Sequence, residues 1–215
     1  MSAVPVLSAV EARVLAVLVE KQRSVPDSYP LTLNALLAGC NQKTARDPVM
    51  QVSDAEAREA LDRLRGLSLA IESSGSRVLR YEHNMERALQ IPSTSAAVLA
   101  VLLLRGPQTA GELRSNCDRL HSFADISAVA GFLHELAARP AGALVVELPR
   151  QPGARENRWA QLLCGAPAAS QAASPAPADS GDADLRSRVE ALEARVADLQ
   201  AQLDAMRAGG TQATD

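Results

Sequence analysis

The side chains in this sequence with the clearest potential for chemistry are arginines that gather in two short segments. Arg77 and Arg80 lie in the first segment, and Arg150, Arg155 and Arg158 lie in the second. A guanidinium group suits bidentate contact with a phosphate, so both segments are candidates for binding a nucleic-acid backbone. The alternative is an ordinary surface role, in which these arginines pair with glutamates of the same segments and contribute little.

A polar segment, residues 41–50, supplies two further cations, Lys43 and Arg46. It lies between two segments with helical apolar spacing, and a longer connection in such a position is often functional. We therefore add Lys43 and Arg46 to the candidate nucleic-acid-binding residues. The alternative is that this segment only caps and braces the neighbouring helices through its own polar side chains.

Catalytic and metal chemistry have little support. His83, His121 and His134 have no nucleophile and orienting carboxylate at a recognisable spacing, and no phosphate-binding glycine motif occurs. Cys117 and His121 would share one helical face, but two ligands without a second pair make a poor zinc site. We expect a protein that is not an enzyme and that has no catalytic residues, no metal and no cofactor.

The two arginine-rich segments close two halves of the chain that repeat the same structural pattern. Residues 14–18 and residues 98–102 have the same sequence, Val-Leu-Ala-Val-Leu. In each half this apolar helix precedes two further helices and then a strand, a turn and a second strand. Three of the predicted helices open with a capping box, formed by Ser8 and Glu11, by Ser53 and Glu56, and by Thr109 and Glu112. The order predicts a mostly helical α+β protein with tandem winged-helix domains, whose wings carry the arginines.

Four parts follow along the chain. Residues 1–91 form the first predicted winged-helix domain, residues 92–165 the second, residues 166–184 a flexible linker and residues 185–208 a coiled-coil helix. The last part has apolar residues in steps of four and three, which predicts a coiled-coil homodimer. Its seam consists of Leu185, Val189, Leu192, Val196, Leu199, Leu203 and Met206. The alternative is a single amphipathic helix that docks on the globular part.

The third helix of a DNA-binding winged helix enters the major groove, so its outward side chains decide what it can bind. The outward residues are Ala55, Glu59, Asp62 and Gly66 in the first half and Ala128, Gly131, Glu135 and Ala138 in the second. Two carboxylates oppose a phosphate in the first half, and no Lys or Arg lies between Asp125 and Arg139 in the second. The small outward residues of the second half suit a protein partner or an intramolecular contact better than base readout. The alternative for either helix is a solvated face without a partner.

Composition places the chain among globular proteins. Hydrophobic residues make up 47% of the 215 residues, and the net charge is −3, without the basic excess typical of a strong nucleic-acid binder. Three cysteines far apart in the sequence do not form a disulfide framework, so we expect reduced, mostly buried thiols. Without a membrane span or a signal peptide in view, a cytoplasmic location is the expectation.

Several motifs resemble those of the bacterial YceH-like family of uncharacterised proteins. They include Leu7-Ser8-Ala9-Val10-Glu11-Ala12-Arg13-Val14, Tyr29-Pro30-Leu31, Cys40-Asn41-Gln42-Lys43-Thr44 and Pro152-Gly153-Ala154-Arg155-Glu156-Asn157-Arg158. The resemblance covers residues 7–165, and it implies a pair of winged-helix domains in a cytoplasmic bacterial protein. It implies no activity and no site residues.

Two functional hypotheses follow from the sequence. The first is a dimeric winged-helix protein that contacts DNA mainly at its phosphates, through the wing arginines and with little base specificity. The second is an adaptor that joins proteins through the neutral third helices and the coiled coil, without direct contact to nucleic acid. Neither hypothesis involves a membrane.

Overall fold

A computed structural model of the chain describes residues 4–73 and 78–167. Within these residues the protein is mostly helical, with two small antiparallel sheets, as the predicted α+β class requires. Arg77 and the whole predicted coiled-coil seam, from Leu185 to Met206, lie outside the described residues. The coiled coil and the dimer therefore stay predictions.

The first half contains three helices and a three-stranded sheet. The helices are α1 (Ala9–Ser24), α2 (Leu33–Cys40) and α3 (Asp54–Gly66), with a short 3-10 helix, Pro26–Ser28, between the first two. The strands are β1 (Leu31–Thr32), β2 (Ala70–Ser73) and β3 (Arg80–His83), in the order β1-β3-β2. The capping boxes of Ser8 with Glu11 and of Ser53 with Glu56 are both present, so the predicted starts of α1 and α3 are confirmed.

The second half has the same order of elements. The helices are α5 (Ser93–Arg105), α6 (Ala110–Cys117) and α7 (Ile126–Ala137), followed by the hairpin of β4 (Val145–Glu147) and β5 (Trp159–Gln161). A short helix, α4 (Met85–Leu89), joins the two halves and was not predicted. The capping box of Thr109 with Glu112 is present at the start of α6, as predicted.

The two sheets correspond strand by strand. In the first half β1 pairs with β3 through Leu31 and Tyr81. In the second half a single antiparallel bridge joins Gln108 to Trp159, one residue before the cap of α6, just as Leu31 immediately precedes the Thr32 cap of α2. The second hairpin therefore has a one-residue counterpart of β1 along the same edge.

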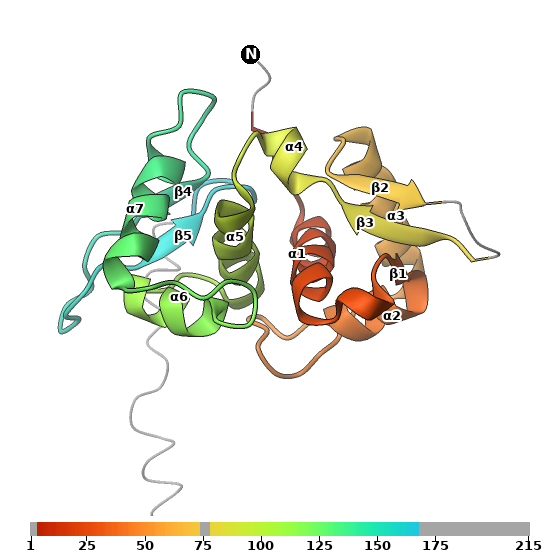
Figure 1. Ribbon diagram of the computed structural model, residues 1–215, viewed down its shortest axis with the longest axis horizontal. Helices are drawn as coiled ribbons and strands as arrows, with labels where there is room; N and C mark the ends of the chain where they lie inside the picture. The colour runs from red at the N-terminus through yellow and green to blue at the C-terminus, as the bar shows by residue number, and fades with distance from the viewer. Residues whose placement is uncertain (1–3, 74–77, 168–215) are drawn as a thin grey trace, which may run out of the picture. The chain divides into compact units, whose positions relative to one another are not determined.

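The core lies around α1 and α5, the two helices that contain the repeated pentapeptide. Every residue from Glu11 to Val19 and every residue from Ser95 to Leu104 is buried. A helix that is apolar around most of its circumference must be covered on all sides, and these two helices pack against one another (Figure 1). The buried side chains of both halves form one continuous hydrophobic cluster. The predicted domain boundary after residue 91 stays a prediction.

None of the helices in residues 4–73 and 78–167 is long and apolar enough to cross a membrane.

Candidate functional site

Arg46 is one of the candidate phosphate-binding residues of the segment 41–50. Its side chain is buried. Its guanidinium lies 2.6 Å from a carboxylate oxygen of Glu20 in α1, and it also donates to the side chain of Gln42 at 2.7 Å. Two further bonds, at 3.1 and 3.2 Å, reach the carbonyl oxygen of Gly39 near the end of α2. The side chain has no exposed surface. Arg46 therefore braces α1 against α2 and cannot contact a phosphate from this position.

A second buried arginine, Arg13, holds the other side of the same segment. It donates to the carbonyl oxygen of Cys40 at 3.1 Å and to that of Pro48 at 2.6 Å. A cation at the C-terminal end of α2 interacts favourably with the helix dipole. Burial lowers the pKa of Arg13, and the like charge of Arg46 lowers it further. The sequence analysis missed this residue because Arg13 lies within an apolar run.

The remainder of the segment is held by further hydrogen bonds to neighbouring elements. The Asn41 side chain donates to the carbonyl of Val52 at 2.9 Å and accepts from its N–H at 2.6 Å. The Asp47 N–H donates to the carbonyl of Leu104 at the end of α5, at 2.7 Å. These contacts support the bracing alternative for residues 41–50. Lys43 is exposed and is the cation of this segment that remains accessible.

Arg80 and Arg158 occupy equivalent places in the two hairpins and make equivalent bonds. Arg80 donates to the carbonyl of Pro30 at 2.8 Å, and Arg158 donates to the carbonyl of Pro107 at 2.7 Å. Each proline lies two residues before the threonine that caps the following helix. Arg158 also pairs with Glu112 at 3.0 Å. Both arginines thus fasten a hairpin to the second helix of its own half.

Arg150 and Arg155 lie in the connection between β4 and β5 and are exposed. Within the described part of the chain, neither forms an ion pair. Together with Lys43 they are the placed members of the predicted nucleic-acid set that remain accessible without a carboxylate partner. Arg77, the remaining member, is outside the described residues.

The third helices carry little accessible positive charge. In α3, Arg58 pairs with Asp54 at 2.5 Å and Arg63 with Glu11 at 3.5 Å. Arg65 pairs with Asp62 at 3.2 Å and with Glu72 of β2 at 3.0 Å. Helix α7 contains no Lys or Arg. Exposed ion pairs of this kind stabilise the fold little, but they cancel the charge that a phosphate would need.

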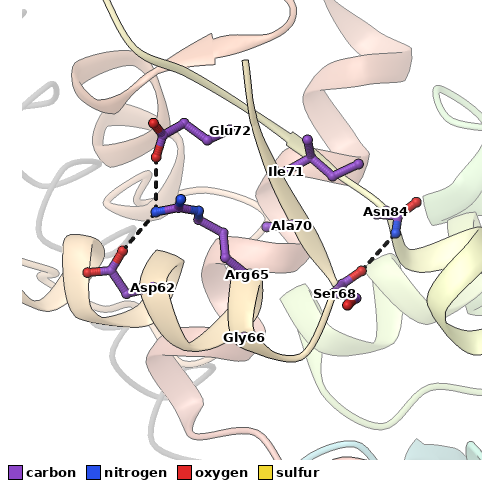
Figure 2. A pocket seen from close by; sticks show the side chains of 8 residues that line it. All are labelled: Asp62, Arg65, Gly66, Ser68, Ala70, Ile71, Glu72 and Asn84. Atoms are coloured by element: carbon purple, nitrogen blue, oxygen red, sulfur yellow. Dashed lines mark hydrogen bonds and ion pairs between the residues drawn. The ribbon is translucent and has the colours of Figure 1, made fainter. Parts of the chain in front are cut away.

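The C-terminal end of α3 borders two adjoining surface depressions, of about 630 and 640 Å³. Figure 2 shows Arg65 reaching from α3 toward Glu72, while Asn84 donates to the carbonyl of Ser68 at 2.8 Å. Residues lining the first depression are Asp62, Arg65, Gly66, Ser68, Ala70, Ile71, Glu72 and Asn84. The second depression is lined by Glu59, Asp62, Arg63, Gly66 and Leu67. The predicted outward residues Glu59, Asp62 and Gly66 all lie on this surface.

His83 and two of the three cysteines are buried in the core. His83 is buried, its Nε2 lies 2.7 Å from the side-chain oxygen of Gln22, and burial lowers its pKa to about 4. Burial raises the pKa of the Cys40 and Cys117 thiols to about 12, so both stay protonated. Cys164 is exposed, unlike the other two. Among the residues that the structure describes, no three His, Cys, Asp or Glu side chains are grouped to hold a metal ion.

The chain matches a family of known proteins over most of its length. The family model described as "Protein of unknown function, DUF480" matches residues 7–154. The chain is 59% identical over 202 residues to a UPF0502 protein of Dechloromonas aromatica (strain RCB), covering 93% of this chain and 95% of the relative. It is 61% identical over 202 residues to a UPF0502 protein of Burkholderia pseudomallei (strain K96243), covering 94% of this chain and 85% of that relative.

Proposed function

The chain belongs to the DUF480 family of bacterial proteins, the YceH-like family that its motifs resemble, and on that premise we propose that it is a non-enzymatic adaptor. In this role it joins proteins through surfaces of two winged-helix units, without direct contact to nucleic acid. The family description names no activity, so the proposal is drawn from the geometry of the described residues.

The repeated contacts between hairpin and second helix support the winged-helix interpretation. Arg80 and Arg158 reach the carbonyls of Pro30 and Pro107, which hold the same place in each half. Three helices closed by an antiparallel hairpin, with one short strand along its edge, are the elements expected of a winged helix. A winged helix can bind either DNA or protein, so its surfaces must decide between them.

The charge of the third helices is the observation that carries the adaptor proposal. Each arginine of α3 has a carboxylate partner, and α7 has no Lys or Arg. A helix in the major groove needs donors for base edges and cations for flanking phosphates. Neither third helix offers this combination, and a protein partner does not require it.

The first hairpin carries exposed apolar side chains, which also favour a protein partner. Ile71 of β2 is 39% exposed, and Leu79, just before β3, is 46% exposed. Burial of large exposed apolar side chains under a protein partner stabilises the complex, whereas a phosphate backbone would cover them little. We therefore assign the partner surface to α3 and the hairpin that follows it.

One observation favours a second candidate, phosphate contact by the second hairpin. Arg150 and Arg155 are exposed and have no ion-pair partner within the described residues, and Lys43 is a third such cation. Phosphate contacts by so few residues would give weak binding that decreases as the salt concentration rises. This candidate is the DNA-binding hypothesis of the sequence analysis, restricted to those predicted residues that are exposed in the structure.

Two measurements on the full chain separate the candidates. The first is fluorescence anisotropy with random-sequence duplex DNA at about 50 mM NaCl, where even non-specific binders have micromolar affinity. The second is chemical cross-linking in the native bacterium, followed by mass spectrometry of the linked peptides. The adaptor proposal expects no saturable DNA binding and a protein partner linked near α3 and the first hairpin.

Matched variants make the result decisive. The change I71E/L79E should abolish the cross-link to the partner, while R150A/R155A should leave it intact. DNA binding in the wild type that R150A/R155A weakens, with a shallower salt dependence, would support the second candidate and contradict the adaptor proposal.

A further inference from the structure

We infer that the two depressions at the C-terminal end of α3 form one docking site for a peptide segment of a protein partner, in which a basic side chain lies next to an apolar one. This inference rests on the adaptor function proposed above and names the surface and the partner chemistry. No nucleic acid fits the same description, because the site carries an excess of carboxylates.

The shape of the surface is the first step. The two depressions share Asp62 and Gly66, so they lie next to one another at the end of α3. Gly66 is the last residue of the helix, and a side chain there would meet no atom within 4 Å. Packing within the described chain therefore does not require glycine at this place. Its small size leaves room where the two depressions join.

The charge of the surface is the second step. Glu59 and Asp62 are three residues apart on one face of α3, and Glu72 faces them from β2 (Figure 2 shows Asp62 and Glu72). Arg65 pairs with two of these carboxylates, and Arg63, which lines the second depression, is paired with Glu11 at 3.5 Å. Glu59 has no hydrogen bond or ion pair within the described residues. An excess of negative charge therefore remains to attract a basic side chain.

Arg65 also demonstrates how a guanidinium is held at this surface. One of its terminal nitrogens lies 3.2 Å from Asp62 and 3.0 Å from Glu72, so two elements already converge on one cation. Glu59, about one turn earlier on the same helix face, offers an unoccupied carboxylate beside this arrangement. An arginine or lysine of the partner would bind there as a charge-assisted contact.

Apolar surface completes the site. Ile71 lines the first depression and is 39% exposed, and Leu67, half-buried, lines the second. An apolar side chain of the partner would cover one of these residues while a neighbouring basic side chain reaches Glu59. Peptide recognition in general combines such a pocket contact with a fixed polar contact.

The test is a selection from a library of random peptides of about twelve residues against the immobilised full chain at physiological salt. Enriched peptides should carry Lys or Arg beside a large apolar residue. Their affinity for E59K/D62K should fall at least about tenfold, measured by fluorescence anisotropy. The control is E135K, which reverses an exposed carboxylate on α7 and should change the affinity less than about twofold.

A charge exchange distinguishes direct contact from a disturbed fold. Replacing the basic residue of the selected peptide by Glu should restore binding to E59K/D62K and abolish binding to the wild type. The inference is overturned if no peptide is enriched, if the enriched peptides are acidic, or if E59K/D62K binds them unchanged. Peptides or a cellular partner bound elsewhere would leave the adaptor function standing, whereas DNA binding without any protein partner would remove both.

Discussion

Most arginines with a defined role in residues 4–73 and 78–167 bind backbone carbonyl oxygens. Arg13, Arg80 and Arg158 do so within one half, and Arg23 joins the halves by donating to Leu120 at 3.2 Å and Ser93 at 2.7 Å. Arg139 likewise reaches the carbonyl of Leu89. Helix ends and loops leave such oxygens without a backbone donor, and a guanidinium offers five N–H groups to satisfy them. Arginine in this fold is therefore mainly a structural residue.

Replacing Arg46 by Ala should destabilise the protein severely. The change leaves the Glu20 carboxylate half-buried without its 2.6 Å partner and leaves the Gly39 carbonyl without its side-chain donor. Breaking a buried ion pair from one side costs about 3 kcal/mol. Urea denaturation followed by circular dichroism measures this loss. The exposed Lys43→Ala is the control, and its effect should stay within about 0.5 kcal/mol; equal effects of the two changes would contradict the bracing role.

His83 makes the stability depend on pH in the acid range. Its pKa is about 4 in the folded protein, because burial and then the charge of Arg23 disfavour protonation, whereas an unfolded histidine titrates near about 6.5. The unfolded state therefore binds a proton first as the pH falls. Stability should decrease from about pH 6.5 toward pH 4, with a loss of about 2.5 kcal/mol at about pH 4.5.

The variant His83→Gln isolates this contribution from that of the carboxylates. Urea unfolding of both proteins at several pH values should show the wild type losing stability more steeply between about pH 6.5 and 4.5. Parallel curves would mean that His83 is protonated in the folded state or that it is accessible to solvent.

At the scale of elements, the structure confirms what depends on neighbouring residues in the sequence. The starts of α1, α3 and α6 follow from capping boxes, which are complete within four residues. Strand β1 has two residues and exists because Leu31 and Thr32 pair with β3, about fifty positions later in the chain. Local patterns cannot predict a strand of that kind.

In the candidate site, too, some features follow from the local sequence and others depend on contacts between distant elements. The outward positions of α3 follow from helical periodicity, and Glu59, Asp62 and Gly66 do line the depressions. The pairing of Arg65 with Glu72 and the burial of Arg46 depend on contacts between elements, so residue type alone predicted an accessible cation at Arg46. A hydrophilic residue in a polar segment is predicted to be exposed unless a distant partner is known.

Glycines in two helices should respond oppositely to replacement by alanine. Gly131 lies in the interior of α7 with an open, exposed side, so Gly131→Ala should stabilise the protein by about 0.5–1 kcal/mol. Gly39 of α2 is packed against α1, where an added Cβ would lie 2.5 Å from a methyl group of Val17. Gly39→Ala should therefore destabilise, and thermal unfolding measures both. A destabilised Gly131→Ala would show that this face of α7 is covered.

At the scale of the whole molecule, the repeat explains the shared core. The pentapeptide helices α1 and α5 are each too apolar to be covered by the small helices and hairpin of one half. Their mutual packing buries the remaining side of each and leaves the third helices and hairpins facing outward. The repeat thus presents two outward faces on one core, which the proposed adaptor would use as binding surfaces. An adaptor needs such an arrangement, because it must hold two partners at once.

The predicted coiled coil would double these surfaces again, and deletion of residues 185–215 tests it. The described residues form a complete hydrophobic core without that segment, so the truncated chain should retain its thermal unfolding transition. It should sediment as a monomer, whereas the full chain should sediment as a dimer, because the predicted heptad seam would supply the apolar contact between helices. The variant V189D/V196D changes two a positions of the seam and should give the same monomer with the chain length intact. A truncated chain that remains dimeric would place the dimer interface on the folded part and would reassign one of the outward faces to self-association.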